Sequence, residues 1–121
     1  MKNIDINDDE IKEVIYYSDG QAITGLWHRL DIFTDFFERR DVFLWVLENL
    51  LREGRIKLQK NGIFLDSPIR DQIEAFRKIW PKNDKPYPNH PDADFYLWFF
   101  DPKCPAGIAW RKEDGSYEIA D

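Results

Sequence analysis

The sequence contains one cysteine and two histidines among its 121 residues. A single cysteine cannot form an internal disulfide bond, and this suits a reducing compartment. The sequence has no run approaching the roughly 20 apolar residues that a membrane-spanning helix needs. Its acidic start, MKNIDINDDE, lacks the apolar segment of a secretory signal peptide. We therefore expect a cytoplasmic protein that does not associate with a membrane.

Motifs for a cofactor or a catalytic centre are also missing. The sequence has no GxGxxG, no phosphate loop, no GxSxG and no closely spaced pair of cysteines or histidines. Asp92 and Asp94 match the start of a calcium-binding loop, but its later ligands and its turn glycine are missing. The sequence thus predicts no cofactor, no metal ion and no catalytic residue, and it favours a protein that is not an enzyme.

Positive charge is scarcer than negative charge: 17 lysines and arginines face 23 aspartates and glutamates, which gives a net charge of −6. Proteins that bind phosphate backbones need an excess of basic side chains, so this balance disfavours a nucleic-acid partner. The acidic excess either keeps the protein soluble or attracts a basic partner. Acidic residues gather at both ends of the chain, at Asp5, Asp8, Asp9, Glu10 and Glu13 and at Glu113, Asp114, Glu118 and Asp121.

Apolar and aromatic residues are plentiful, at 43% and 16% of the chain. A chain of this length and composition can bury one hydrophobic core, so we expect a single globular domain over residues 1–121. Four segments carry apolar residues at helical spacing: residues 8–18, 22–30, 36–54 and 67–80. Asp8 is the expected N-cap of the first helix, and Ser67 is that of the last, with Pro68 in its first turn. Residues 36–54 are apolar nearly all round, which predicts a central helix.

Strand patterns lie between and after these helices. Residues 55–66 alternate around Asn61-Gly62, a strong hairpin signal, and residues 107–120 predict two strands joined at 113–115. Residues 81–92 are rich in proline and predict a loop. The predicted fold class is therefore α+β: N-terminal helices, a β-hairpin, a further helix and a C-terminal antiparallel β unit.

The aromatic run FYLWFF, residues 95–100, is compatible with a short strand or with one or two helical turns, and we favour the strand. Strict alternation would place Phe95, Leu97 and Phe99 on one face and the other three side chains on the opposite face. Both faces would then be apolar. They would have to be covered within the chain or by a second copy in a homodimer, or be left as a patch for another protein.

Cys104 is the residue that decides between an enzyme and a binding protein. A catalytic thiol needs a lowered pKa, and only Lys103, His28 and His90 could provide a nearby cation or base. Pro105 removes the backbone donor that would follow the thiol. We interpret Cys104 as a small buried residue at a corner, and a cysteine-dependent enzyme is the second alternative.

Nucleic-acid binding is the first alternative. A helix followed by a basic hairpin with Arg52, Arg55, Lys57 and Lys60 resembles the order of elements in a winged helix. A recognition helix must present polar side chains to the bases, whereas residues 42–51 are mostly apolar. We expect this helix to be buried and the hairpin charges to be solvated.

Several runs of the sequence resemble a family of small acidic bacterial proteins of unknown function: LLREGRIKL, NGIFL, FRKIWP, WFFDPKCPAGIAW and DGSYEIAD. The resemblance spans about residues 22–121. Members of that family occur near polymorphic or contact-dependent toxin genes, which implies an immunity-type role. Many delivered toxins are nucleases and hence basic, so we expect an acidic protein with this role to be attracted to a basic toxin domain. The resemblance supplies no catalytic residue.

The combined expectation is a protein that binds another protein through carboxylates on its loops. The residues that we expect at this interface are Asp84, Asp92, Asp94 and Asp101. The N-terminal acidic residues are an equal alternative.

Overall fold

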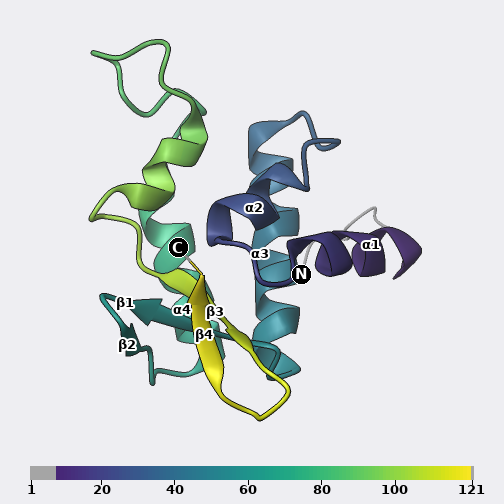
Figure 1. Ribbon diagram of the computed structural model, residues 1–121. Helices are drawn as coiled ribbons and strands as arrows, with labels where there is room; N and C mark the ends of the chain where they lie inside the picture. Colours follow the sequence, from purple (N-terminus) through teal and green to yellow (C-terminus); the bar gives the residue numbers. More distant parts are fainter. Residues whose placement is uncertain (1–7, 121) are drawn as a thin grey trace.

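The structure is a computed structural model that describes residues 8–120, apart from the side chains of Asp8 and Ile11. Its fold is α+β, as predicted, with helices first and a four-stranded antiparallel sheet completed at the end (Figure 1). The elements are α1 (Asp8–Ser18), α2 (Ile23–His28), α3 (Phe36–Arg52), β1 (Ile56–Lys60), β2 (Ile63–Phe64), α4 (Ile69–Ile79), the 3₁₀ helix η1 (Phe95–Phe100), β3 (Gly107–Arg111) and β4 (Tyr117–Ala120).

The sheet has the strand order β2-β1-β3-β4, and every neighbouring pair is antiparallel. The predicted β1–β2 hairpin is confirmed, and its turn residues Asn61 and Gly62 have φ values of 54° and 82°. Both central residues of this turn need a positive φ, which is why Asn-Gly favours it. The central pair joins distant parts of the chain, since Ile56 lies opposite Trp110.

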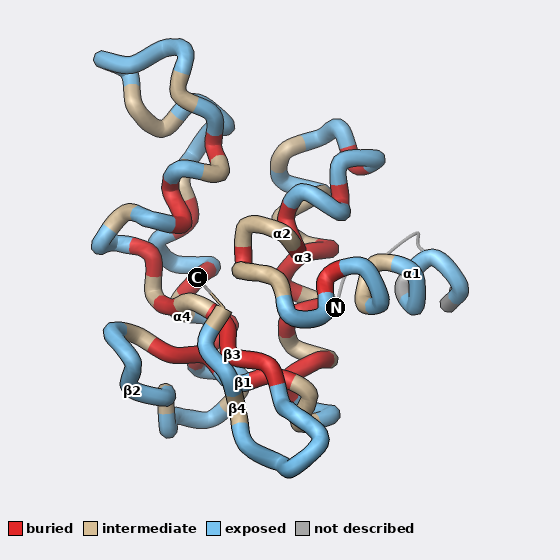
Figure 2. Tube along the Cα trace, in the orientation of Figure 1, coloured by how far each residue is buried: buried red, intermediate tan, exposed pale blue. Residues whose placement is uncertain are grey.

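Helix α3 is the central helix, as the sequence predicts. The Asp35 side chain caps its start by accepting a hydrogen bond from the Glu38 N–H at 2.8 Å. Figure 2 shows buried residues along much of its length. Its buried side chains are Val42, Phe43, Leu44, Val46, Leu47, Leu50 and Leu51.

The prediction of a strand at residues 95–100 is wrong, because this segment forms η1. Its side chains follow a period of three, so Phe95, Trp98 and Phe99 are buried while Leu97 and Phe100 are exposed. A strand would have sent Phe99 and Trp98 to opposite faces. The 3₁₀ turn instead lets three rings of one segment join the same aromatic cluster, which includes Trp27 and Trp80.

One predicted helix cap differs in the structure, and another lies outside the described residues. Pro68 is the N-cap of α4, one residue later than the Ser67 cap that the sequence suggested. The Ser67 carbonyl instead accepts a hydrogen bond from Nε2 of Gln72 at 2.7 Å. The cap expected of Asp8 and the packing expected of Ile11 lie outside the described residues.

Among residues 8–120, no helix is both long enough and apolar enough to cross a membrane.

Candidate partner-binding surface

Helix η1 presents one exposed row of side chains to solvent. Residues three apart in a 3₁₀ helix lie one above the other, so Leu97 and Phe100 share a line. Asp94 is the N-cap that precedes them, and its carbonyl accepts a hydrogen bond from the Leu97 N–H at 3.2 Å. The exposed fraction is 69% for the Asp94 side chain, 37% for Leu97 and 66% for Phe100. We call these three residues the η1 ridge. It is an apolar strip that begins at a carboxylate.

A second carboxylate, Asp101, lies at the other end of η1. Its Oδ1 accepts a hydrogen bond from the Lys103 N–H at 2.9 Å, and its Oδ2 accepts one from the Tyr87 hydroxyl at 3.0 Å. These two donors, that of Lys103 first, hold the pKa of Asp101 below its usual value. Asp101 is therefore ionised at neutral pH, and it ties the proline-rich loop to the end of η1.

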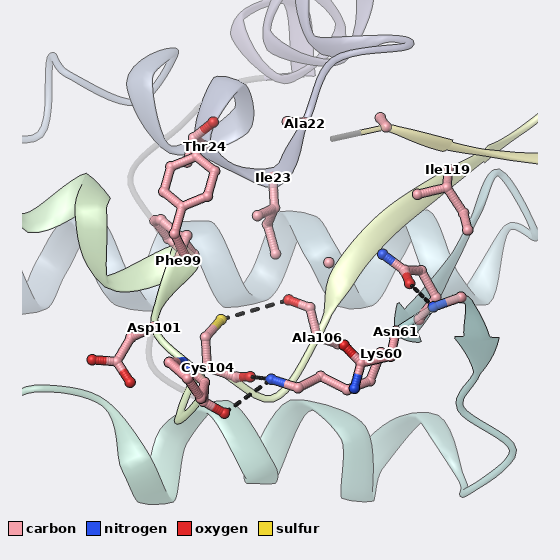
Figure 3. Close-up of a pocket in the computed structure, with 16 residues that line it drawn as sticks. Ala22, Ile23, Thr24, Lys60, Asn61, Phe99, Asp101, Cys104, Ala106 and Ile119 are labelled. Atoms are coloured by element: carbon pink, nitrogen blue, oxygen red, sulfur yellow. Dashed lines mark hydrogen bonds between the residues drawn. The ribbon is translucent and has the colours of Figure 1, made fainter.

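A cavity of about 780 Å³ adjoins the end of the ridge (Figure 3). It is open to solvent and is lined by the start of α2, the turn between β1 and β2, the end of η1, the segment 101–107 and the end of β4. Ile23, Phe99, Phe100 and Ile119 give it an apolar lining. We call it the η1 cavity. Phe100 belongs both to this cavity and to the η1 ridge, so the two form one continuous surface.

Lys60 holds the segment that closes one side of this cavity. Its Nζ donates hydrogen bonds to the main-chain oxygens of Pro102, at 3.0 Å, and of Cys104 (Figure 3). A lysine ammonium has three donors, so these two bonds use most of its capacity. Lys60 therefore acts as a clamp between the β1–β2 hairpin and the 101–106 segment.

Cys104 is buried, with 2% of its surface exposed, which confirms its interpretation as a packed corner residue. Its Sγ donates a weak hydrogen bond to the Ala106 oxygen at 3.5 Å. Burial raises the pKa of this thiol to about 11, so it is protonated at neutral pH. Neither His28 nor His90 lines the η1 cavity, and both are exposed elsewhere.

The sequence did not predict a role for Gln59, which provides a buried polar group in the cavity wall. It is 7% exposed, and its Oε1 accepts a hydrogen bond from the Gly62 N–H at 2.8 Å. The side-chain amide packs against Gly107, where an added Cβ would lie 2.9 Å from Nε2. This Nε2 has no hydrogen-bond partner among the described residues. The sequence feature that could have indicated this contact is Gly107, the first residue of β3, since a glycine in a strand often marks the close approach of another group.

The structure places the four predicted aspartates along one stretch of chain. Asp84 and Asp94 line the same hollow of about 320 Å³, and Asp94 forms an ion pair with Lys85 at 3.5 Å. Asp92 is exposed in the turn before η1, and Asp101 lines the η1 cavity. Six residues of 3₁₀ helix rise about 12 Å, so η1 separates Asp101 from Asp94. Their role in binding remains a prediction.

The equally eligible N-terminal acids are placed only in part, because Asp5 and the Asp8 side chain lie outside the described residues. Asp9 is exposed on α1, while Glu10 and Glu13 line a separate hollow beside α2. Within residues 8–120, histidine, cysteine, aspartate and glutamate side chains form no group of three that could hold a metal ion.

The basic residues of the hairpin, which suggested DNA binding, mostly have partners within the protein. Arg52 pairs with Glu48 at 3.0 Å, and the Lys57 ammonium lies 4.7 Å from the centroid of the Tyr117 ring. The Lys60 ammonium binds main-chain oxygens. Residues 42–51 of α3 are largely buried, as expected, so this helix does not present a face for a DNA groove. DNA binding itself remains an untested alternative.

Comparisons with known proteins place the chain in a family. No curated protein matches it. Its structure is similar to that of an uncharacterised protein conserved in bacteria, from Neisseria meningitidis. The TM-score is 0.78 and the sequence identity 28%, over 90% of this chain and 85% of that one. The family DUF596, described as proteins of unknown function, matches residues 51–119. This match covers more than half of the sequence, including η1, the first three strands and β4 up to residue 119, and the chain therefore belongs to the DUF596 family.

Proposed function

We propose that this protein binds another protein and acts as a non-enzymatic immunity protein. In this role it neutralises a bacterial toxin by covering the active or substrate-binding surface of that toxin. The observation that carries the proposal is the η1 ridge, where apolar side chains stand exposed between two carboxylates.

The apolar part of the ridge supports protein binding. A fully buried phenylalanine or leucine side chain is stabilised by about 1.5–3 kcal/mol relative to an exposed one. Phe100 gains little of this in the free protein and Leu97, at 37% exposed, gains only part of it, whereas Phe95, Trp98 and Phe99 of the same helix are buried. Aromatic residues that lie in a surface patch with a charged rim are typical anchors of protein interfaces.

The charged part of the ridge supports a basic partner. Asp84, Asp92 and Asp94 are exposed near the start of η1, and the whole chain carries a net charge of −6. Complementary charge accelerates association and disfavours wrong partners. A toxin that acts on nucleic acid carries basic side chains at its substrate-binding surface, which is the surface that such an inhibitor would cover.

The proposal is tested with the purified protein and the product of the neighbouring gene. We expect a stable complex by calorimetry, together with protection of cells that express the neighbouring gene. If the product of no neighbouring gene binds, and cells gain no protection, the proposal is wrong.

A charge-matched pair of variants tests the acidic surface. The triple variant Asp84→Asn, Asp92→Asn and Asp94→Asn should lower the association rate constant by about tenfold at low salt and flatten its salt dependence. The control variant Glu53→Gln, Asp66→Asn and Glu113→Gln removes the same charge from exposed positions elsewhere. Equal effects of the two variants would mean that overall charge, rather than this surface, attracts the partner.

A further inference from the structure

We infer that the η1 cavity receives an extended segment of the basic partner, which inserts an apolar side chain and places a main-chain carbonyl against Nε2 of Gln59. This inference rests on the proposed function and adds the pocket and the chemistry of its occupant.

The size and the lining of the cavity fit an inserted side chain and its backbone. Its volume of about 780 Å³ lies within the range of roughly 300–1,000 Å³ that is usual for binding pockets. Ile23, Phe99 and Ile119 line it, and Phe100 stands at its border with the η1 ridge. A peptide segment bound here therefore also contacts the ridge, and an occupant that spans both the cavity and the ridge is longer than a small ligand.

Gln59 determines which chemical group of the occupant can contact the cavity wall, namely a hydrogen-bond acceptor. The Gly62 N–H can only donate, so the amide oxygen of Gln59 must face it, and Nε2 must point the other way. The residue is almost fully buried, and water in the open cavity can serve Nε2 in the free protein. An occupant that displaces this water needs an acceptor at the same place, because a buried unpaired donor is costly. A peptide carbonyl provides one.

Charge decides between a basic partner and a second copy of this chain. Lys60 and Asp101 are the lining side chains that carry a charge at neutral pH, and the Lys60 ammonium is held by two main-chain oxygens. The carboxylates of Asp94 and Asp101 flank the exposed strip. A second copy would bring the same carboxylates and the same net charge of −6 to this surface, whereas a segment with lysine or arginine would complement them.

The test measures binding of the same neighbouring gene product to two variants. Gln59→Glu keeps an oxygen for the Gly62 N–H but replaces the donor, and Phe100→Ser removes the ring at the border of the cavity. Each should weaken binding by about tenfold or more.

Ile32→Ser is the control for Phe100→Ser, because both side chains are 66% exposed. Gln72→Glu is the control for Gln59→Glu, because both glutamines are 7% exposed. Both controls should bind like wild type.

A spectroscopic readout on the unaltered protein tests the inference even if Gln59→Glu fails to fold. The side-chain amide signals of Gln59 should shift when the partner is added, while those of Gln72 should not. If the partner binds with wild-type affinity to Phe100→Ser and leaves the Gln59 signals unchanged, the inference is wrong and the proposed function stands. If no partner binds at all, both fail. Gln59 signals that shift with protein concentration alone would assign the cavity to a second copy and overturn the basic partner.

Discussion

The guanidinium of Arg39 lies over the indole of Trp27, with its Cζ 4.2 Å from the ring centroid. It also donates two hydrogen bonds to the main-chain oxygen of Trp27, at 3.2 Å from Nε and 2.6 Å from the terminal nitrogen. Burial lowers the pKa of Arg39, and the nearby Asp31 partly offsets this effect. One side chain of α3 thus fixes both the ring and the backbone of α2.

The Arg39→Lys variant should therefore be destabilised by about 1–2 kcal/mol, because lysine keeps the charge but not the planar fork or the stacking. Urea unfolding of the variant and the wild type measures this difference. Arg52→Lys is the control, since Arg52 makes an exposed i,i+4 pair with Glu48 and should change stability by less than about 0.5 kcal/mol. Equal losses in the two variants would show that the contacts with Trp27 add nothing.

Trp80 should be the most costly ring to remove, because it lies among six other aromatic rings of the core. We expect Trp80→Ala to cost about 3–5 kcal/mol in the free energy of unfolding. Trp80→Phe should cost much less, because the buried indole N–H of Trp80 has no partner among the described residues and its loss breaks no bond. Denaturant unfolding of both variants tests the order, and a larger loss in Trp80→Phe would contradict it.

The buried thiol predicts a specific dependence of stability on pH. The pKa of Cys104 is raised from 9.0 to about 11 in the fold, so between these values the unfolded chain loses a proton that the folded chain keeps. Its contribution is fully present below pH 9 and is lost as the pH rises toward 11, by on the order of 2 kcal/mol.

Comparing the wild type with Cys104→Ala isolates this effect, because lysines and tyrosines titrate in both proteins. The stability difference between them should shrink between about pH 8 and about pH 10.5. A difference that stays constant over this interval would mean that the thiol is not protected from solvent. Slow alkylation of the native thiol, relative to the unfolded one, would agree with its burial.

Two glycines of the cavity wall should respond differently to alanine. At Gly107 the new Cβ would crowd Nε2 of Gln59, the far end of a flexible side chain, so we expect a small loss of stability and a displaced amide. Gly62 has open space around it but a φ of 82°, and alanine there should cost about 1–2 kcal/mol. Urea unfolding ranks the two variants, and the amide signals of Gln59 report its displacement in Gly107→Ala. The reverse ranking would contradict the assigned causes.

Much of the fold follows from local sequence signals. The helices show apolar spacing, and Asn61-Gly62 specifies the hairpin because of the positive φ that its turn needs. The segment 95–100 was predicted wrongly because all six residues are apolar or aromatic, so they carry no contrast between two faces. Only the position of Trp27 and Trp80 decides which rings are buried, and this is a tertiary effect.

The candidate site was predicted less completely than the fold. The sequence placed carboxylates on a loop but could not show that Asp84 and Asp94 line one hollow while Asp101 lies beside another. Gln59 becomes part of a cavity wall only through the pairing of β1 with β3, where it lies opposite Gly107. Gly107 is a local hint of a close approach, but it does not indicate which distant residue approaches.

That pairing also affects how the protein can be made. The partner of β1 is a strand about fifty residues further along the chain. Until β3 has left the ribosome, one edge of the β1–β2 hairpin has no neighbouring strand. An open edge of this kind can pair with other chains, and contacts between distant residues form slowly. The nascent chain is therefore most prone to aggregate in the interval between the exit of β1 from the ribosome and the exit of β3.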